Sequence, residues 1–207
     1  MNLYTIHSES HREMALKYLL PSIPDSIQCH SRYVAHQHCK SGSFYNDGWT
    51  DACYEKVVFF RDICLKEMGN IFIFSDADVQ LFGDPTEQLL SELGHNDIAC
   101  QDDINQFCSG FFVCRANDKT LAMFDAMLSN YILEDQATLN RHLGMVNAIK
   151  LSHVFFNVAH SIQTVWDGQD FEIPNDMLVH HANWTVGVEN KIKLMDLVKV
   201  KYDLFRK

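Results

Sequence analysis

The segment IFIFSDADVQLFGDP, from Ile71 to Pro85, joins a strongly apolar run to two closely spaced aspartates. Its first four residues are large and apolar, a composition typical of a strand that is covered on both faces of a sheet. Residues two apart on a strand project to the same side, so Asp76 and Asp78 would point at one spot. Carboxylates that close raise each other's pKa unless a cation lies between them. The segment therefore predicts a buried strand that ends at a metal ion.

Segments of strand type and helix type alternate along the rest of the chain. Strands are expected at residues 2–7, 27–36, 71–78, 96–101 and 108–116 and near Ile149 and Phe155, and helices at residues 12–21, 50–69, 84–94, 118–132, 134–144 and 190–205. This alternation predicts an α/β sandwich with a mostly parallel sheet, in which ligands bind beyond the carboxyl ends of the strands. No repeat or linker divides the chain. We expect one domain over residues 1–207, either alone or as the N-terminal part of a larger chain.

Composition narrows the choice of partners and compartment. The 207 residues are 47% hydrophobic, which suits a sizeable core, and the net charge of −10 argues against nucleic acid or an anionic membrane as the main partner. The seven cysteines include no Cys-x-x-Cys pair, which favours free thiols in a reducing compartment. The first residues, MNLYTIHSESHREM, lack a long apolar core, so we expect no signal peptide, and no apolar run of about 18 residues occurs. We therefore expect a cytoplasmic protein without a membrane span, monomeric or part of a multidomain chain.

Four segments in a fixed order carry a family resemblance. They are FSDADVQLFGDP (residues 74–85), CSGFFVCRAN (108–117), DQATLN (135–140) and HHANWTVGVENKIKLM (180–195), and with the helix EKVVFFRDICLKEMGN (55–70) they cover most of the chain from Glu55 to Met195. Together they resemble the GT-A glycosyltransferases, specifically the nucleotide-diphospho-sugar transferase family with its Asp-x-Asp motif. The resemblance implies a GT-A (Rossmann-like) sandwich. The short length is also similar to that of the small glycosyltransferase domains of large chlorella viruses, which would act in the host cytoplasm.

The resemblance implies a divalent cation, Mn²⁺ or Mg²⁺, that bridges the two phosphates of a nucleotide sugar. Its ligands would be Asp76, Asp78 and His181, and carboxylate oxygens with one imidazole suit Mn²⁺ particularly well. His180 is the rival of His181, because neighbours on an extended segment face opposite ways. The alternative interpretation of the aspartates is a turn at the strand end, in which each carboxylate caps backbone amides.

The family likeness also indicates the residues that would hold the donor. They are Thr5, Ile6, His7, Lys56, Asp76, Ala77, Ser109, Gly110, Gly187 and Lys191. The end of the first strand would hold the base, although Ile6 is better explained as an ordinary core residue. Lys56 could equally be a surface lysine, and Lys191 could belong to a solvated helix face. Gly187 would allow the backbone to approach the diphosphate, where Lys191 would act as a point charge.

Three residues are candidates for the chemistry. Asp135 would accept hydrogen bonds from sugar hydroxyls and Gln136 would lie near the anomeric carbon, whereas Asp135 could also be a simple N-cap. The amide of Gln136 is not ionised, so it is neither a base nor a good nucleophile, and a retaining front-face reaction is expected. Asp103 could instead serve as the base of an inverting reaction. A loop with Tyr45, Asp47 and Trp49 would form either a sugar platform or a hydrophobic lid.

The predicted function is transfer of a hexose or deoxyhexose from a UDP-sugar, UDP-glucose or UDP-rhamnose, to a glycan or protein-linked sugar acceptor. A domain that binds sugar nucleotides without turnover is the first alternative, against which the intact set of candidate residues argues. A phosphatase of the haloacid dehalogenase type also places an Asp-x-Asp at a strand end. That motif needs Thr or Val two residues after the second aspartate, where this chain has Gln80.

Overall fold

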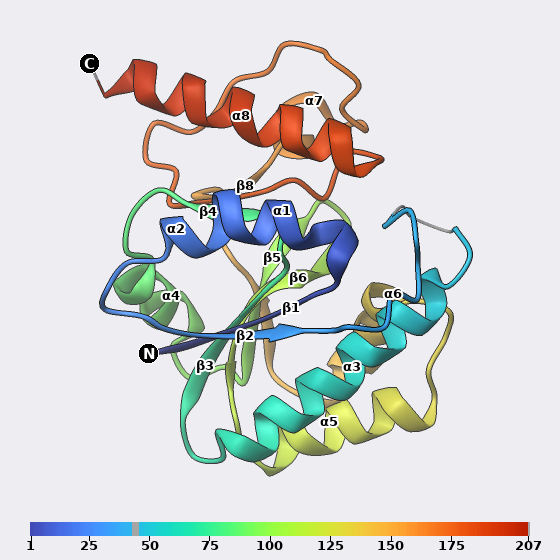
Figure 1. Cartoon of the computed structure of the whole chain (residues 1–207). Coiled ribbons are helices and arrows are strands. Elements are labelled where there is room, and N and C mark those ends of the chain that lie inside the picture. Colours follow the sequence, from blue (N-terminus) through green and yellow to red (C-terminus); the bar gives the residue numbers. More distant parts are fainter. Residues whose placement is uncertain (43–45, 207) are drawn as a thin grey trace.

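The computed structural model describes residues 1–42 and 46–206 of the chain, and it confirms the predicted α/β sandwich (Figure 1). The strands are β1 (Asn2–His7), β2 (Gln28–Tyr33), β3 (Ile71–Ser75), β4 (Val79–Leu81), β5 (Ile98–Asp103), β6 (Gln106–Arg115), β7 (Ala148–Lys150), β8 (Phe155–Asn157) and β9 (Val179–His181). The α-helices are α1 (Arg12–Met14), α2 (Leu20–Ser22), α3 (Trp49–Lys66), α4 (Thr86–Leu93), α5 (Asp118–Ser129), α6 (Asp135–His142), α7 (Ala159–Ile162) and α8 (Val188–Phe205). A π-helical segment, η2 (Ala15–Leu19), joins α1 to α2, and the 3₁₀ segments are η1 (Glu9–His11) and η3 (Leu143–Met145).

The main sheet has six strands in the order β2-β1-β3-β6-β5-β7. Strand β1 is parallel to β2 and β3, and β5 is parallel to β7, whereas β6 runs antiparallel to both of its neighbours. Because β6 is reversed, its beginning lies at the same sheet edge as the carboxyl ends of β1, β3 and β5. Side chains from four strands therefore meet at one edge.

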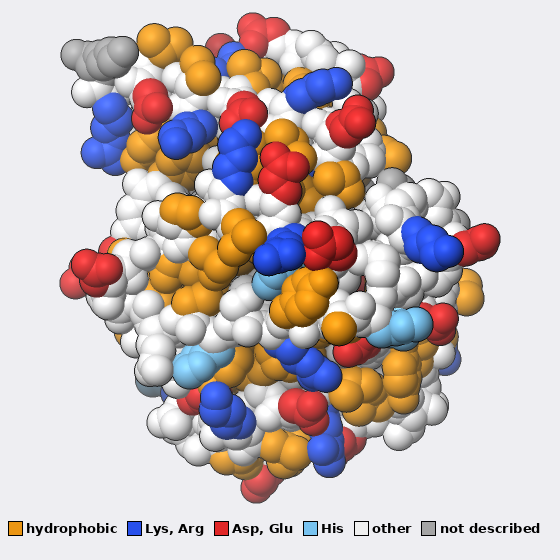
Figure 2. All heavy atoms as spheres, in the orientation of Figure 1, with side chains coloured by type: hydrophobic (Ala, Val, Ile, Leu, Met, Phe, Trp, Pro, Cys, Tyr) orange, Lys and Arg blue, Asp and Glu red, His pale blue; other side chains and the backbone are white. Residues whose placement is uncertain are grey.

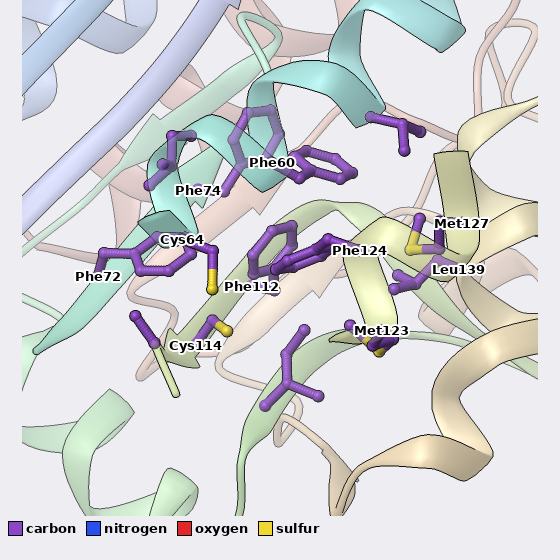
Figure 3. Packing of buried hydrophobic residues seen from close by; sticks show 14 of the residues in the cluster. Phe60, Cys64, Phe72, Phe74, Phe112, Cys114, Met123, Phe124, Met127 and Leu139 are labelled. Atoms are coloured by element: carbon purple, nitrogen blue, oxygen red, sulfur yellow. The ribbon is translucent and has the colours of Figure 1, made fainter. Parts of the chain in front are cut away.

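Side chains of β3 and β6 alternate between two cores, as the strand period of two residues requires. Phe72, Phe74 and Phe112 face helices α3, α5 and α6, and Figure 3 shows them grouped with Phe60 and Phe124 in one aromatic cluster. All five rings are fully buried. Burial of a side chain of this size stabilises the fold by roughly 1.5–3 kcal/mol, so the cluster holds α3 and α5 against the sheet through Phe60 and Phe124.

The opposite face of the main sheet is covered by α4 and by a second sheet of three strands in the order β4-β9-β8. Ile73 and Val113 pack here against Val79 and Val179 of the small sheet. Helix α8 closes the outer side of the small sheet, and it crosses the top of the molecule in Figure 1. The sequence did not predict this second sheet: a strand was expected near Phe155, but β4 and β9 were not expected as strands of their own.

The strand predicted over residues 71–78 is wrong in its second half. Strand β3 ends at Ser75, residues 76–78 form a turn, and β4 begins at Val79 in the second sheet. The gap left between the strands expected at residues 96–101 and 108–116 is also mostly strand, because β5 extends to Asp103 and β6 begins at Gln106. The aspartate pair thus lies where the chain passes from one sheet to the other.

The surface mixes both signs of charge. On the face shown in Figure 2, Lys and Arg side chains are interspersed with Asp and Glu side chains rather than gathered into a single basic area. Among the described residues, no helix has the length and apolar character that crossing a membrane requires.

Candidate active site

Three potential metal ligands converge beyond the carboxyl end of β3. Asp76 and Asp78 come from the turn between β3 and β4, and His181 comes from the end of β9, which pairs with β4 through Val79. The backbone amide of Ala182 donates to the carbonyl of Asp78 at 3.0 Å, which fixes the two segments together. One ligand atom from each of the three side chains lies within 4.8 Å of the others. The pair of sheets therefore brings two carboxylates and one imidazole together, although a turn rather than strand alternation makes the aspartates neighbours.

The rival ligand His180 points away from this cluster. Its imidazole is fully buried, and its Nδ1 lies 3.2 Å from Oε1 of Gln80. His181 instead places Nε2 3.3 Å from Oδ1 of Asp78. The opposite orientation of the two histidines follows from their adjacent positions on a strand.

Gly110 forms the floor beneath the ligands. A Cβ atom at this position would lie 2.3 Å from Cε1 of His181 and 2.6 Å from Oδ2 of Asp76. The backbone amide of Asp76 also donates to the carbonyl of Gly110 at 2.7 Å. Because Gly110 has no side chain, the ligand atoms of Asp76 and His181 can lie directly over its backbone. The space between these ligands, called the Gly110 cradle below, fits a small cation.

Lys56 connects the metal cluster to Asp135. Its ammonium group lies 2.8 Å from Oδ2 of Asp76 and 2.8 Å from Oδ2 of Asp135, and its side chain is only 13% exposed. The hydroxyl of Ser109 donates to the same oxygen of Asp135 at 2.5 Å. The alternative of a surface lysine at position 56 is therefore wrong. The structure also places Asp135 at the first residue of α6, directly after the N-cap residue Glu134, with its carboxylate bound to Ser109 and Lys56 at the sheet edge.

Gln136 is held by a second hydrogen-bond network. Its amide Nε2 donates to Oδ2 of Asp103 at 2.7 Å, and its Oε1 lies 3.4 Å from the backbone amide of Ser109. Oδ1 of Asp103 accepts from Nδ2 of Asn183 at 2.9 Å and from the indole of Trp184 at 2.5 Å. Asp103 thus accepts three hydrogen bonds, and it orients Gln136 and Trp184 at the same time.

Lys191 reaches the cluster from the first turn of α8. Its ammonium group donates to Oδ2 of Asp78, so it belongs to the site rather than to a solvated helix face. The helix begins directly after Gly187, whose φ of 87° lies in the left-handed region that favours glycine.

The electrostatics of the cluster reflect burial and close charges. Burial raises the pKa of Asp76, with Lys56 opposing the shift. Burial would also raise the pKa of Asp78, but Lys191 and His181 hold it well below the usual range. For His181, burial lowers the pKa but the Asp78 carboxylate outweighs it and raises the value to about 10. Burial likewise opposes ionisation of Asp135, yet Lys56 keeps its pKa below the usual value.

A cleft runs on both sides of the metal cluster. The β1 side is lined by residues that include Ile6, His7, Val34, Cys53 and Ala77. The β6 side is lined by residues that include Asp103, Ser109, Gly110, Gln136, Trp184 and Gly187. Both sides share Gly42, Trp49, Lys56, Asp76, Asp78, Asp135 and Lys191. The aspartate pair therefore divides the cleft into two compartments.

Most of the predicted site residues line this cleft, with one exception. Thr5 is fully buried and lines neither side, so only Ile6 and His7 represent the first strand. Trp49 lines both sides, whereas Tyr45 of the same predicted loop lies outside the described residues.

A profile of the nucleotide-diphospho-sugar transferases matches residues 25–195, which is most of the chain. The protein belongs to this family. No curated protein matches the chain in sequence. Because the chain belongs to this family, the alternative of a haloacid dehalogenase-type phosphatase is dropped.

Solved structures show the same fold for this nucleotide-diphospho-sugar transferase. A glycosyltransferase involved in glycosylation of the major capsid of PBCV-1 superposes with a TM-score of 0.64 at 10% identity, over 95% of this chain and 98% of that chain. The galactosyltransferase LgtC, in complex with donor and acceptor sugar analogs, gives 0.56 at 12% identity over 95% and 96%. GlyE from Streptococcus pneumoniae gives 0.58 at 14% identity, and the alignment covers 94% of this chain and 59% of GlyE. These similarities establish the GT-A fold.

Three polar residues of the transferase site were missed by the sequence interpretation. Trp184 and Asn183 bond to Asp103, and the buried Gln101 bonds to His181. The first two lie within the segment HHANWTVG that carries the family likeness, so their position was a usable signal. Nothing in the strand sequence IACQDD distinguishes Gln101 from a surface residue.

Proposed function

We propose that this transferase is metal-dependent and moves a hexose or deoxyhexose from a UDP-sugar to a carbohydrate acceptor with retention of the anomeric configuration. The observation that carries the proposal is the position of Asp76 and Asp78, which cluster with His181, between the two sides of the cleft. A nucleotide diphosphate would cross the cluster with its nucleoside on the β1 side and its sugar on the β6 side. UDP-glucose and UDP-rhamnose are the donors we propose to test first.

Each side chain then has a chemical role. A bound Mn²⁺ or Mg²⁺ would stabilise the negative charge that collects on the departing diphosphate. Asp135, ionised and anchored by Lys56, would accept hydrogen bonds from sugar hydroxyls on the β6 side. Lys191 would leave Asp78 and bind the diphosphate instead. The indole face of Trp184, fixed by Asp103, is our candidate for contact with the acceptor ring.

Retention is supported by the surroundings of Gln136. An inverting enzyme needs a carboxylate aimed at the acceptor hydroxyl, and a double displacement needs one within reach of the anomeric carbon. Gln136 is an amide, and the Asp103 carboxylate beside it already accepts three hydrogen bonds. We therefore propose a front-face reaction, in which a diphosphate oxygen takes the proton of the acceptor hydroxyl.

Thermal unfolding with a panel of nucleotides, with and without Mn²⁺, tests the metal and nucleotide parts of the proposal. Ligand at 100 times its dissociation constant stabilises by about 2.7 kcal/mol, which for a chain of this size raises Tm by roughly 5–11 °C. We expect this shift for UDP with Mn²⁺ but not for inorganic phosphate with Mn²⁺. Asp78→Ala should remove the metal-dependent part of the shift. An equal response to UDP without metal would contradict the proposal.

Proton NMR of the first-formed product, read before mutarotation, tests the stereochemistry. An inverted anomeric signal would rule out retention and would make Asp103 the leading candidate for a catalytic base. If the protein binds UDP with Mn²⁺ but turns over no UDP-sugar with any acceptor, the alternative of a non-catalytic binding domain would hold instead.

A further inference from the structure

Gln101 lies on β5, two residues before Asp103, and its side chain is fully buried. The register of β5 with β6 shifts between Cys100 and Asp102, so Gln101 lies opposite a bulge formed by residues 108–111 of β6. Bulges near functional sites commonly re-aim a side chain. Here the side chain leaves the main sheet and reaches the second sheet.

The surroundings of Gln101 fix which way its amide points. Its Nε2 donates to the backbone carbonyl of Phe155 at 3.1 Å and to that of Phe156 at 3.0 Å, both on β8. Carbonyl oxygens only accept, so the NH₂ group must face them and Oε1 must face the other way. Oε1 lies 2.8 Å from Nδ1 of His181. Since an amide oxygen only accepts, Nδ1 of His181 has to carry a proton.

A proton on Nδ1 leaves Nε2 as the ring nitrogen with the free lone pair in the neutral imidazole. Nε2 is the atom that faces Oδ1 of Asp78, at 3.3 Å. The thiol of Cys108 also lies near Nδ1, at 3.6 Å, but it is a weak acceptor and cannot set the ring orientation alone.

We propose that Gln101 is a positioning residue for the metal site, because it fixes both the tautomer and the ring orientation of His181. Ligating histidines commonly donate their second N–H to such a partner, and loss of the partner costs metal affinity about 10–100-fold. The inference rests on the proposed function in one respect, namely that a divalent cation binds to this cluster. It assigns a role to a residue that touches neither the cation nor the substrates.

A pair of variants separates positioning from structural support. Gln101→Met removes the acceptor for His181 and also both donors to β8. Gln101→Glu loses the same two donors but keeps an acceptor for Nδ1. We expect Mn²⁺ affinity, measured by calorimetry with UDP present, to fall about 10–100-fold in Gln101→Met and to stay near the wild-type value in Gln101→Glu. Equal losses in the two variants would overturn the proposal.

The neighbouring pair of Gln80 and His180 supplies a matched control. Gln80 is also buried and presents Oε1 to Nδ1 of a histidine on β9, but that histidine lies outside the metal cluster. Gln80→Met should therefore leave Mn²⁺ affinity unchanged. If Gln101→Met retains the same affinity as Gln80→Met, Gln101 does not position the ligand.

A measurement on the wild type does not depend on how the variants fold. In protein loaded with diamagnetic Mg²⁺ and UDP, nitrogen-15 NMR should show the single imidazole proton of His181 on Nδ1, protected from exchange. A proton on Nε2 would overturn the inference. Wild-type protein that binds no divalent cation at all would instead contradict the proposed function, so the two failures are distinguishable.

Discussion

The absence of a side chain at position 110 leads to a sharp prediction. In Gly110→Ala, the new Cβ would lie 2.3 Å from Cε1 of His181 and 2.6 Å from Oδ2 of Asp76. Ordinary contacts between carbon atoms are about 3.5–4.0 Å, so the imidazole would have to move by roughly 1 Å or more. Metal sites tolerate shifts of only about 0.2 Å in their ligand distances. The substitution should thus displace one ligand completely and crowd a second.

The expected loss is at least that caused by disturbing a ligand's orientation, about 10–100-fold in Mn²⁺ affinity or roughly 1.4–2.7 kcal/mol. The extra methyl group in a packed region should also lower the free energy of unfolding by about 1–3 kcal/mol. Calorimetric titration of Mn²⁺ in the presence of UDP measures the first effect, and urea unfolding without metal measures the second.

Gly144 provides the matched control. It lies in η3, and a Cβ atom there would have no heavy atom within 4 Å, so Gly144→Ala should change neither quantity by much. Gly110→Ala protein that is folded and binds Mn²⁺ and UDP as tightly as the wild type would refute the assignment of the Gly110 cradle as the metal site.

Three further predictions concern other residues. Lys191→Met should leave the buried Asp78 carboxylate without its ammonium partner, so Mn²⁺ should raise the Tm of this variant more than that of the wild type. UDP binding in the presence of Mn²⁺ should weaken about tenfold or more. If the variant and the wild type respond equally in calorimetry and in melting, this prediction is contradicted. Leu133 is 71% exposed and its φ of 59° lies in the left-handed region, which strains a leucine backbone more than an asparagine backbone. Leu133→Asn should therefore raise the free energy of unfolding in urea by about 0.5–1 kcal/mol, and a loss of stability would show that the backbone is not strained there. Burial lowers the pKa of His180 to about 3, so the folded protein keeps this imidazole neutral at pH values where the unfolded chain already binds a proton. The free energy of unfolding is therefore unaffected by His180 above the unfolded pKa near 6.5, and it decreases as the pH falls from there toward 3. His180→Gln should therefore flatten the decline of the unfolding free energy between pH 6 and pH 4 by about 1.4 kcal/mol per pH unit, and an unchanged slope would contradict the prediction.

The main sheet and its helices could be predicted because long elements carry a clear pattern. Phe72 and Phe74 alternate with Ile73 across two cores, and this is the signature that the apolar run at residues 71–74 displays. Strands β4 and β9 have three residues each, too few for a period to be recognised, and the strand expected near Phe155, which is β8, was not assigned to a second sheet. Their pairing depends on packing between sheets, which local sequence does not encode.

The site shows the same contrast between local and distant information. Asp76 and Asp78 were expected together because they are close in sequence, and His181 was placed with them by family likeness. The geometric reason given for the aspartates was wrong, since they lie in a turn rather than on a strand. Gln101 could not be found at all, because its proposed role depends on the irregular pairing of β5 with β6 and on carbonyl groups more than 50 residues away.

The two lysines of the site differ in how firmly they are held. Lys56 has two carboxylate partners, and its ammonium group also lies 5.5 Å from the ring centre of Phe74 and 5.8 Å from that of Phe60. Lys191, in the first turn of α8, pairs with one carboxylate among residues 1–42 and 46–206, that of Asp78. A charge with two buried partners is costly to move, whereas a charge with one can exchange it for a phosphate oxygen. Lys56 is therefore the fixed counter-charge that keeps Asp135 ionised, and we expect Lys191 to be the cation that moves to a bound diphosphate.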